Sequence, residues 1–185
     1  MPTDLSSYNK QNYHPGRNKL VVALWYVINH LLFKSAFFPF SKIKISILRL
    51  FGATIGKGVN LKPFVSIKYP WHLTIGDHCW IGEGVWIDNL VEVKLEDNVC
   101  ISQGAMLLTG NHDYSKISFD LMTGKIVLES GVWVGAKAIV GPGVRAGSHM
   151  VLSAGSVAGN DLKAYGIYQG NPAVWKRERS FDTEN

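Results

Sequence analysis

An aliphatic residue recurs every six positions through most of this 185-residue chain, and this period constrains the fold more than any other feature. The positions fall into five groups: Ile55, Leu61, Ile67; Ile75, Ile81, Ile87; Leu95, Ile101, Leu107; Leu128, Val134, Val140; and Ala146, Leu152. A period of six fits neither an α-helix nor a plain two-faced strand. It is typical of a solenoid in which the chain turns a corner every six residues.

Glycine directly follows the aliphatic residue at positions 56, 76, 82, 135, 141 and 147. We expect it there because glycine adopts backbone conformations at a corner that bulkier residues resist. Three faces make one coil of about eighteen residues, so the sequence predicts a mainly β protein, a parallel β-helix of about five coils.

The repeat divides the chain into an N-terminal part (residues 1–54), the β-helix (residues 55–162) and a C-terminal tail (residues 163–185). The step from Leu107 to Leu128 is far longer than six residues, so we expect a loop at about residues 109–127 to project from the solenoid. Loops on a rigid scaffold often carry functional residues.

The N-terminal part contains two stretches with apolar residues at helical spacing, residues 20–33 and 41–51. We expect these helices to cap the open first coil, and residues 1–19 to form an extended arm that lies over a neighbour. Asn29, His30 and Lys34 interrupt the apolar stretch, which argues against a membrane-spanning helix. No clear cleavage site follows the late apolar run, which argues against a secretory signal.

Charge is unevenly distributed, because residues 1–76 contain ten Lys or Arg and one acid, Asp4, whereas residues 77–185 contain nine bases and thirteen acids. This asymmetry indicates an anionic partner for the N-terminal end. No nucleic-acid-binding motif accompanies it, so a phospholipid surface or a diphosphate-linked substrate is the preferred interpretation. Two cysteines, Cys79 and Cys100, form no disulfide framework and are consistent with a reducing, cytoplasmic setting.

One corner of the predicted solenoid combines an acid with a histidine. Ile87 and Leu107 begin the third face of successive coils and should stack about 4.8 Å apart. Asp88, Asn89 and the loop with His112 therefore leave the solenoid at the same corner. His112 also has Asp113 beside it, and histidine suits a general base because its pKa lies near neutral pH.

Other chemistry is less well supported. Five histidines are expected to have surface or packing roles: His14, His30, His72, His78 and His149. The sequence contains no nucleophile elbow, no phosphate-binding P-loop and no convincing metal-ligand spacing. We therefore predict no metal site.

The phased repeat resembles the hexapeptide-repeat acyltransferases, and several segments share the resemblance: Thr109-Gly110-Asn111-His112-Asp113-Tyr114, Val140-Gly141-Pro142-Gly143-Val144, Ala154-Gly155-Ser156-Val157 and Gly170-Asn171-Pro172-Ala173. The greatest likeness is to the colanic-acid-biosynthesis type of O-acetyltransferase, and it covers about residues 50–178. It implies a left-handed β-helix, a homotrimer and acetyl-CoA as co-substrate.

The resemblance also implies transfer of the acetyl group to a sugar hydroxyl of a cell-surface polysaccharide or its lipid-linked precursor, at the inner face of the cytoplasmic membrane. His112 would be the general base, with Asp88, Asn89, Asp113 and Tyr114 on the side of the acceptor. The residues implied for CoA are Trp133, Ala136, Ala154, Gly155, Asn160, Lys176 and Arg177, with Arg179 near the phosphates. Many relatives carry Thr-Lys where this chain has Gly159-Asn160, so the resemblance does not imply the CoA contact of that lysine here, and the C-terminal bases are expected to take its place.

Three alternatives remain open at this stage. The same scaffold supports N-acetylation of an amino sugar nucleotide, and a β-helix without activity could serve as a trimeric scaffold. A zinc-dependent carbonic anhydrase is disfavoured, because no second histidine follows His112 before His149.

Overall fold

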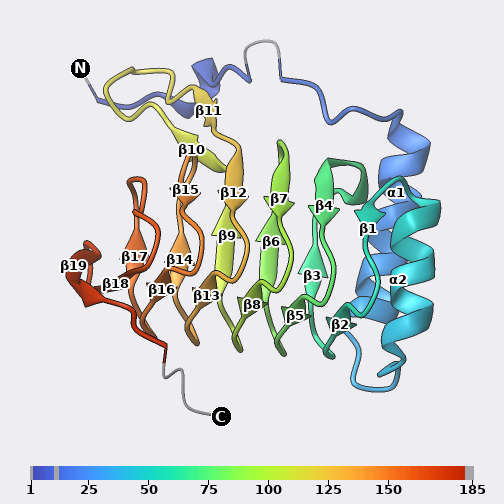
Figure 1. Ribbon diagram of the computed structural model, residues 1–185. Coiled ribbons are helices and arrows are strands. Elements are labelled where there is room, and N and C mark those ends of the chain that lie inside the picture. The colour runs from blue at the N-terminus through green and yellow to red at the C-terminus, as the bar shows by residue number, and fades with distance from the viewer. Residues whose placement is uncertain (1, 11–12, 182–185) are drawn as a thin grey trace.

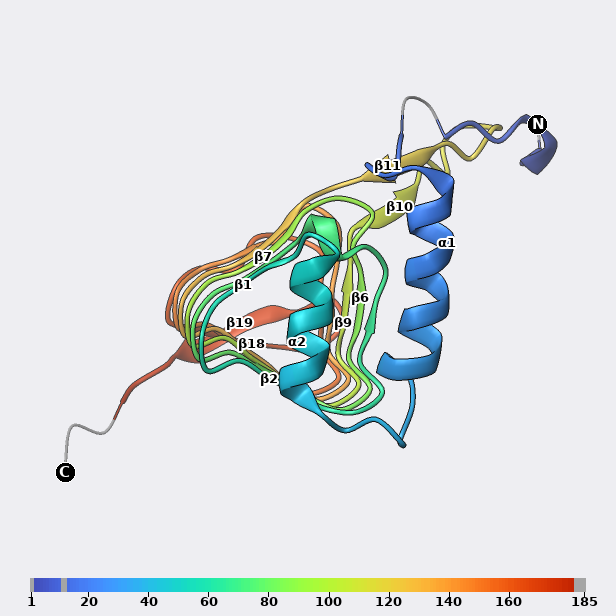
Figure 2. The same ribbon diagram turned by 90° about the vertical axis from the view of Figure 1, so that its right-hand side faces the viewer.

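The computed structural model describes residues 2–10 and 13–181 and shows a parallel β-solenoid with three faces (Figures 1 and 2). Sheet A contains β1 (Thr54–Ile55), β4 (Leu73–Ile75), β7 (Val93–Leu95), β12 (Ile126–Leu128) and β15 (Arg145–Ala146). Sheet B contains β2 (Asn60–Leu61), β5 (Trp80–Ile81), β8 (Cys100–Ile101), β13 (Trp133–Val134), β16 (Val151–Leu152) and β18 (Gly166–Gln169). Sheet C contains β3 (Ser66–Ile67), β6 (Trp86–Asp88), β9 (Met106–Leu108), β14 (Ile139–Val140) and β17 (Val157–Ala158).

The aliphatic positions of the repeat stack in register along the inside of the solenoid. Ile75 pairs with Leu95, which pairs with Leu128, and each of these side chains is at most 1% exposed. Continuous burial of such side chains supplies the main favourable contribution to folding. The predicted fold is confirmed, and its five coils are extended by part of a sixth.

Most of the sixth coil lies in the segment expected to be a tail. Leu162 forms a bridge with Ala146 of sheet A, and β18 continues sheet B beside β16. The chain then folds back as β19 (Val174–Glu178), which pairs antiparallel with β18. The boundary expected at residue 162 therefore falls inside the solenoid. The sequence did not reveal the last coil because its aliphatic residues do not keep the spacing of six.

The glycines that follow the aliphatic positions have a different cause from the one expected. In the structure the left-handed backbone conformation occurs elsewhere in the turns, for example at Gly58, His78 and His149. At Gly135 a Cβ atom would instead lie 2.5 Å from the backbone nitrogen of Ala154 in the next coil. Close approach between coils, rather than an unusual dihedral angle, requires glycine there.

Two helices form a cap at the first-coil end of the solenoid, and in the end view of Figure 2 the second helix crosses the open coil while the first stands beside it. They are α1 (Lys19–Ile28), which continues as a π-helical segment (Asn29–Phe33), and α2 (Ser41–Leu50). The buried Trp25 ring packs against Phe33 and Phe51, and its Nε1 donates a hydrogen bond to the Ile67 carbonyl of β3 (2.9 Å). No helix in the described ranges is long and apolar enough to cross a membrane.

The long insertion forms a hairpin of β10 (Gly110–His112) and β11 (Leu121–Thr123), which projects where sheet C leads into sheet A. The N-terminal arm runs from α1 along the solenoid to this hairpin, and it includes the short 3₁₀ helix Leu5–Ser7 (Figure 1). Asp4 donates its backbone N–H to Ile117, and Leu121 donates to Asn9. The arm thus packs on a hairpin of its own chain.

Candidate active site

The corner after sheet C brings the predicted acid and histidine together. The register pairs Ile87 with Leu107, so Asp88 and the start of the hairpin leave the solenoid on adjacent coils. The buried Thr109 connects them, because its hydroxyl donates to the Asp88 carbonyl (2.9 Å) and its carbonyl accepts from the Gly124 N–H. These bonds fix the base of the hairpin that carries His112.

His112 is held by the hairpin itself, not by a carboxylate. Its Nδ1 lies 3.1 Å from the carbonyl oxygen of Phe119, and the two rings stack with centroids 4.4 Å apart and planes 9° apart. Because a carbonyl only accepts, this bond places the proton on Nδ1 and leaves Nε2 as the basic nitrogen. Phe119 has a left-handed backbone (φ 50°), an uncommon conformation for a non-glycine residue.

The expected carboxylate partners of His112 have other contacts. Asp113 accepts hydrogen bonds from Ser115, and Asp88 Oδ1 lies 2.9 Å from the Lys68 ammonium. The imidazole is therefore oriented by a backbone carbonyl and not by either of these acids.

His112 and Asp88 line a cavity of about 360 Å³, which we call the proximal cavity. Its lining also includes Lys68 and Tyr69 of the solenoid and Tyr8, Lys10 and Tyr13 of the arm. Tyr8 lies against His112, with ring centroids 5.7 Å apart. Sequence reasoning missed all five residues. Lys68 could have been predicted, because the six-residue phase stacks it beside Asp88. No signal in the sequence places Tyr8 or Tyr13 at this site.

Three residues expected on the acceptor side do not line the proximal cavity. Asn89 is fully buried, and its amide accepts from the Tyr69 N–H and donates to the Tyr69 carbonyl, so it joins adjacent coils. Asp113 bonds within the loop, and the Tyr114 side chain is 83% exposed. Two extra residues interrupt the six-residue repeat near Asn89. The buried Asn89 amide takes the place of the backbone hydrogen bonds between coils that this insertion disrupts.

The residues expected to bind CoA lie mostly on another side of the solenoid. Trp133 is half exposed on sheet B, where its Nε1 donates to the Ser102 hydroxyl (2.9 Å). Ala136 and the Ala154–Gly155 turn lie between sheets B and C, and the Gly155 N–H donates to the Ala136 carbonyl (2.8 Å).

The other three expected CoA residues are exposed at different places. Lys176 and Arg177 lie on β19 at the end of sheet B. Asn160 follows β17 of sheet C. It therefore lies at the same corner of the solenoid as the His112 hairpin, but in a later coil. Within one chain, sheet C separates the proximal cavity from most of the expected CoA residues.

The buried Cys79 is not a candidate nucleophile. Burial raises the pKa of the Cys79 thiol to about 11, so this cysteine stays protonated and unreactive at neutral pH. In the part of the chain that the structure describes, no three His, Cys, Asp or Glu side chains gather as they would around a metal ion.

Comparison with known proteins identifies the family. Over 176 residues the chain is 36% identical to the putative colanic acid biosynthesis acetyltransferase WcaF of Escherichia coli (strain K12), covering 95% of this chain and 97% of that protein. The chain belongs to this acetyltransferase family. It is also 26% identical over 136 residues to the galactoside O-acetyltransferase of E. coli K12, covering 72% of this chain and 67% of that enzyme. No protein-family model matches the chain.

Solved structures share the fold. The hexapeptide-repeat acetyltransferase VCA0836 of Vibrio cholerae O1 biovar eltor, complexed with acetyl coenzyme A, superposes with a TM-score of 0.81 at 19% identity, covering 95% of this chain and 97% of that one. Galactoside acetyltransferase in complex with coenzyme A gives a TM-score of 0.72 at 23% identity, covering 87% and 80%. At these identities the likeness concerns the fold alone.

Proposed function

We propose that the chain is an acetyl-CoA-dependent O-acetyltransferase that modifies a sugar hydroxyl in the biosynthesis of a cell-surface polysaccharide of the colanic-acid type. Its family relationship supports acetyl transfer, and the complexes of its structural neighbours with acetyl-CoA and CoA support the co-substrate. The observation that carries the proposal is the His112 ring, whose Nδ1 faces the Phe119 carbonyl while the ring lines the proximal cavity.

In the proposed reaction, Nε2 of His112 acts as general base. A sugar hydroxyl is a weak nucleophile at neutral pH, so an adjacent base is needed. The hydroxyl proton passes to Nε2 while its oxygen forms the new bond to the acetyl carbonyl carbon. The carbon–sulfur bond then breaks, and the leaving thiolate takes the proton back from the imidazolium.

The proximal cavity has the chemistry of a carbohydrate site. Tyr8, Tyr13 and Tyr69 provide ring surfaces, and Lys68 and Asp88 can donate to and accept from hydroxyl groups. We assign Asp88 and Lys68 to the acceptor. Asn89 is not assigned to it, because both ends of its amide bond to Tyr69.

We further propose that the active enzyme is a homotrimer in which CoA binds between two subunits. In support of this, Trp133, Ala136, Ala154 and Gly155 lie across sheet C from the His112 cavity of the same chain. A groove between neighbouring chains would bring both sets of residues to one CoA molecule. Lys176 and Arg177 are then proposed to contact its phosphates, in place of the lysine missing at Asn160.

The helical cap is proposed to rest on the inner face of the cytoplasmic membrane. Nine large apolar side chains are exposed on the two helices and their linker: Leu20, Leu24, Tyr26, Val27, Leu31, Phe37, Phe40, Ile43 and Leu50. Four of them, Leu20, Leu24, Val27 and Leu31, follow helical spacing. Residues 5–76 contain no acid, and bases such as Lys19, Lys34 and Lys42 surround the apolar surface, which suits an anionic bilayer. This position would give access to lipid-linked acceptors.

The first test measures thiol release from acetyl-CoA with a panel of sugars, sugar nucleotides and amino sugars. His112→Ala should lower kcat/KM by about 10²-fold or more, the usual contribution of a general base. His30→Ala is the matched control, because His30 is exposed on the cap and does not line the proximal cavity, and this variant should retain wild-type activity. Equal activity of His112→Ala and wild type would refute the role of His112.

The panel also tests the alternatives. A best acceptor with a free amine would replace O-acetylation by N-acetylation, and the absence of acetyl-CoA binding would favour the scaffold hypothesis.

The trimer proposal has its own test, in which subunits carrying His112→Ala are mixed with subunits carrying Gly155→Trp. Mixed trimers should recover part of the activity that each variant lacks alone, because some sites then contain two intact halves.

A further inference from the structure

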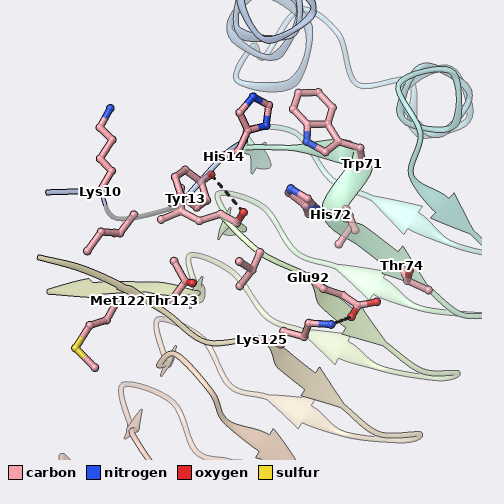
Figure 3. Close-up of a pocket in the computed structure, with 14 residues that line it drawn as sticks. Lys10, Tyr13, His14, Trp71, His72, Thr74, Glu92, Met122, Thr123 and Lys125 are labelled. Atoms are coloured by element: carbon pink, nitrogen blue, oxygen red, sulfur yellow. Dashed lines mark hydrogen bonds and ion pairs between the residues drawn. The ribbon is translucent and has the colours of Figure 1, made fainter. Parts of the chain in front are cut away.

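A second, larger cavity of about 840 Å³ adjoins the proximal cavity, and we call it the distal cavity (Figure 3). The two cavities share four lining residues: Lys10, Tyr13, Leu90 and Leu121. The Tyr13 hydroxyl donates to the Leu90 carbonyl (3.3 Å), which ties the arm to the solenoid at this shared wall. The two cavities therefore meet at Tyr13, and a ligand anchored beside His112 would reach the distal cavity by passing this residue.

Segments from four parts of the chain form the distal cavity. They are the arm, the 3₁₀ turn Pro70–His72 with β4, the expansion near Val91, and β11 with the residues after it. In Figure 3, His14 and Trp71 lie on one side of the cavity, and the Glu92–Lys125 pair lies on the opposite side. The cavity is thus built from three insertions that interrupt the regular repeat, whereas an uninterrupted solenoid would leave a flat face here.

The lining suits a ligand rich in hydroxyl groups, and Lys10 adds a positive charge and hydrogen-bond donors at the wall shared with the proximal cavity. Glu92 and Lys125 form an ion pair (3.0 Å) that presents both acceptors and donors while its charges compensate. Thr74 and Thr123 add hydroxyl groups, and Trp71 adds a ring surface. Burial lowers the pKa of His72, so its imidazole stays neutral and adds no cationic charge for a phosphate.

We infer that the distal cavity binds the sugar residue adjacent to the acetylated one, so that the acceptor is an oligosaccharide of at least two residues. This inference rests on the proposed function. The volume of the distal cavity is within the range of small-molecule sites. Contacts made there, away from the reacting hydroxyl, orient the acceptor and raise kcat/KM above the value for a single sugar.

The discriminating experiment fills the distal cavity while leaving the proximal one open. Thr123 lines only the distal cavity and is exposed on β11, so Thr123→Trp adds bulk there without a core rearrangement. Ile117→Trp is the matched control, because Ile117 is 44% exposed on the same hairpin and lines neither cavity. The probes are methyl galactoside and methyl glucoside, compared with di- and trisaccharides that end in the same sugars.

Wild type should act on the preferred disaccharide with kcat/KM at least about tenfold above that of the matching methyl glycoside, a gain of about 1.4 kcal/mol. Thr123→Trp should remove this gain and leave the methyl glycoside rate unchanged, and Ile117→Trp should change neither. Equal rates on both acceptors, or an equal loss on both in Thr123→Trp, would overturn the inference. Preference for a sugar nucleotide that only Thr123→Trp abolishes would also overturn it, because a nucleotide would then fill the cavity.

Failure of the proposed function gives a different pattern. If no probe releases thiol, binding of the same disaccharides is measured by calorimetry with wild type, Thr123→Trp and Ile117→Trp. Binding that only Thr123→Trp weakens supports the distal cavity as a carbohydrate site even without acetyl transfer. Absence of binding, or equal binding by all three proteins, refutes it.

Discussion

At the scale of single residues, the burial of Lys44 in the cap is expected to destabilise the protein. Lys44 is fully buried on α2, and among the described residues its ammonium has no hydrogen-bond partner, only the Phe33 ring at 5.7 Å. Lys44→Met keeps the aliphatic length and should stabilise the protein by about 1 to 3 kcal/mol, the cost of an unpaired buried polar group. Thermal unfolding of the two proteins measures this difference.

The pH dependence of the Lys44→Met effect separates this cause from simple repacking. Burial lowers the Lys44 pKa, so the unfolded chain binds the proton more tightly and wild-type stability rises with pH toward the ordinary lysine pKa of about 10.4. The variant lacks this contribution. The gain from Lys44→Met should therefore shrink between neutral pH and pH 10, and a gain that is constant with pH would contradict the argument.

The six-residue repeat could predict some residues of the site but not others. His112 and Asp88 were predictable, because the six-residue phase sets which residues stack at a corner. The phase does not describe side chains inside an irregular loop, so the carbonyl of Phe119 was not foreseen as the partner of His112. Asn89 was misassigned because a polar residue at an expansion can equally well repair the backbone hydrogen bonds that the expansion disrupts.

At the scale of elements, the cap should behave as a membrane-binding unit. Leu24 and Leu31 are 54% and 63% exposed on α1 and its continuation, so the double variant Leu24→Ser/Leu31→Ser should fold normally. Its binding to phosphatidylglycerol vesicles in a flotation assay should be at least about tenfold weaker than that of wild type, given the apolar area removed.

The control for vesicle binding lies at the opposite end of the solenoid. Val174→Ser/Trp175→Ser removes comparably exposed apolar side chains from β19 and should bind vesicles as wild type does. Wild type should bind phosphatidylcholine vesicles weakly, and its binding should weaken as salt is added. Equal binding by both double variants would show that the cap is not the lipid-binding surface.

The sequence predicted the helices and the regular coils, but it did not predict the path of the N-terminal arm. The two helices and every coil of regular phase were predictable, because apolar periodicity reports which face is buried. The arm has no such period. Its path depends on backbone hydrogen bonds from Asp4 and to Asn9 with the hairpin, which leave no pattern in side-chain type. The proximal and distal cavities could not be predicted for the same reason, since Lys10 and Tyr13 of the arm line both of them.

At the scale of the whole molecule, the spacing between coils limits which residues the corners accept. A Cβ atom at Gly135 would lie 2.5 Å from Ala154 N and 2.7 Å from Leu152 O, whereas one at Gly159 would meet nothing within 4 Å. Gly135→Ala must therefore push coil five away from coil four, and we expect a loss of about 1 to 3 kcal/mol, or roughly 3 to 10 °C in Tm.

Gly159→Ala is the matched variant, and it should be neutral or stabilising by up to about 1 kcal/mol, because alanine restricts the unfolded chain.

Hydrogen exchange can locate the part of the solenoid that Gly135→Ala destabilises. Gly135→Ala should accelerate exchange at the amides that join coils four and five, such as Trp133 to Met150 and Gly135 to Leu152, before those of coils two and three. Each coil pairs only with its neighbours, so a local defect opens the adjacent ladder first. Uniform acceleration along the solenoid would mean instead that the coils unfold as one cooperative unit.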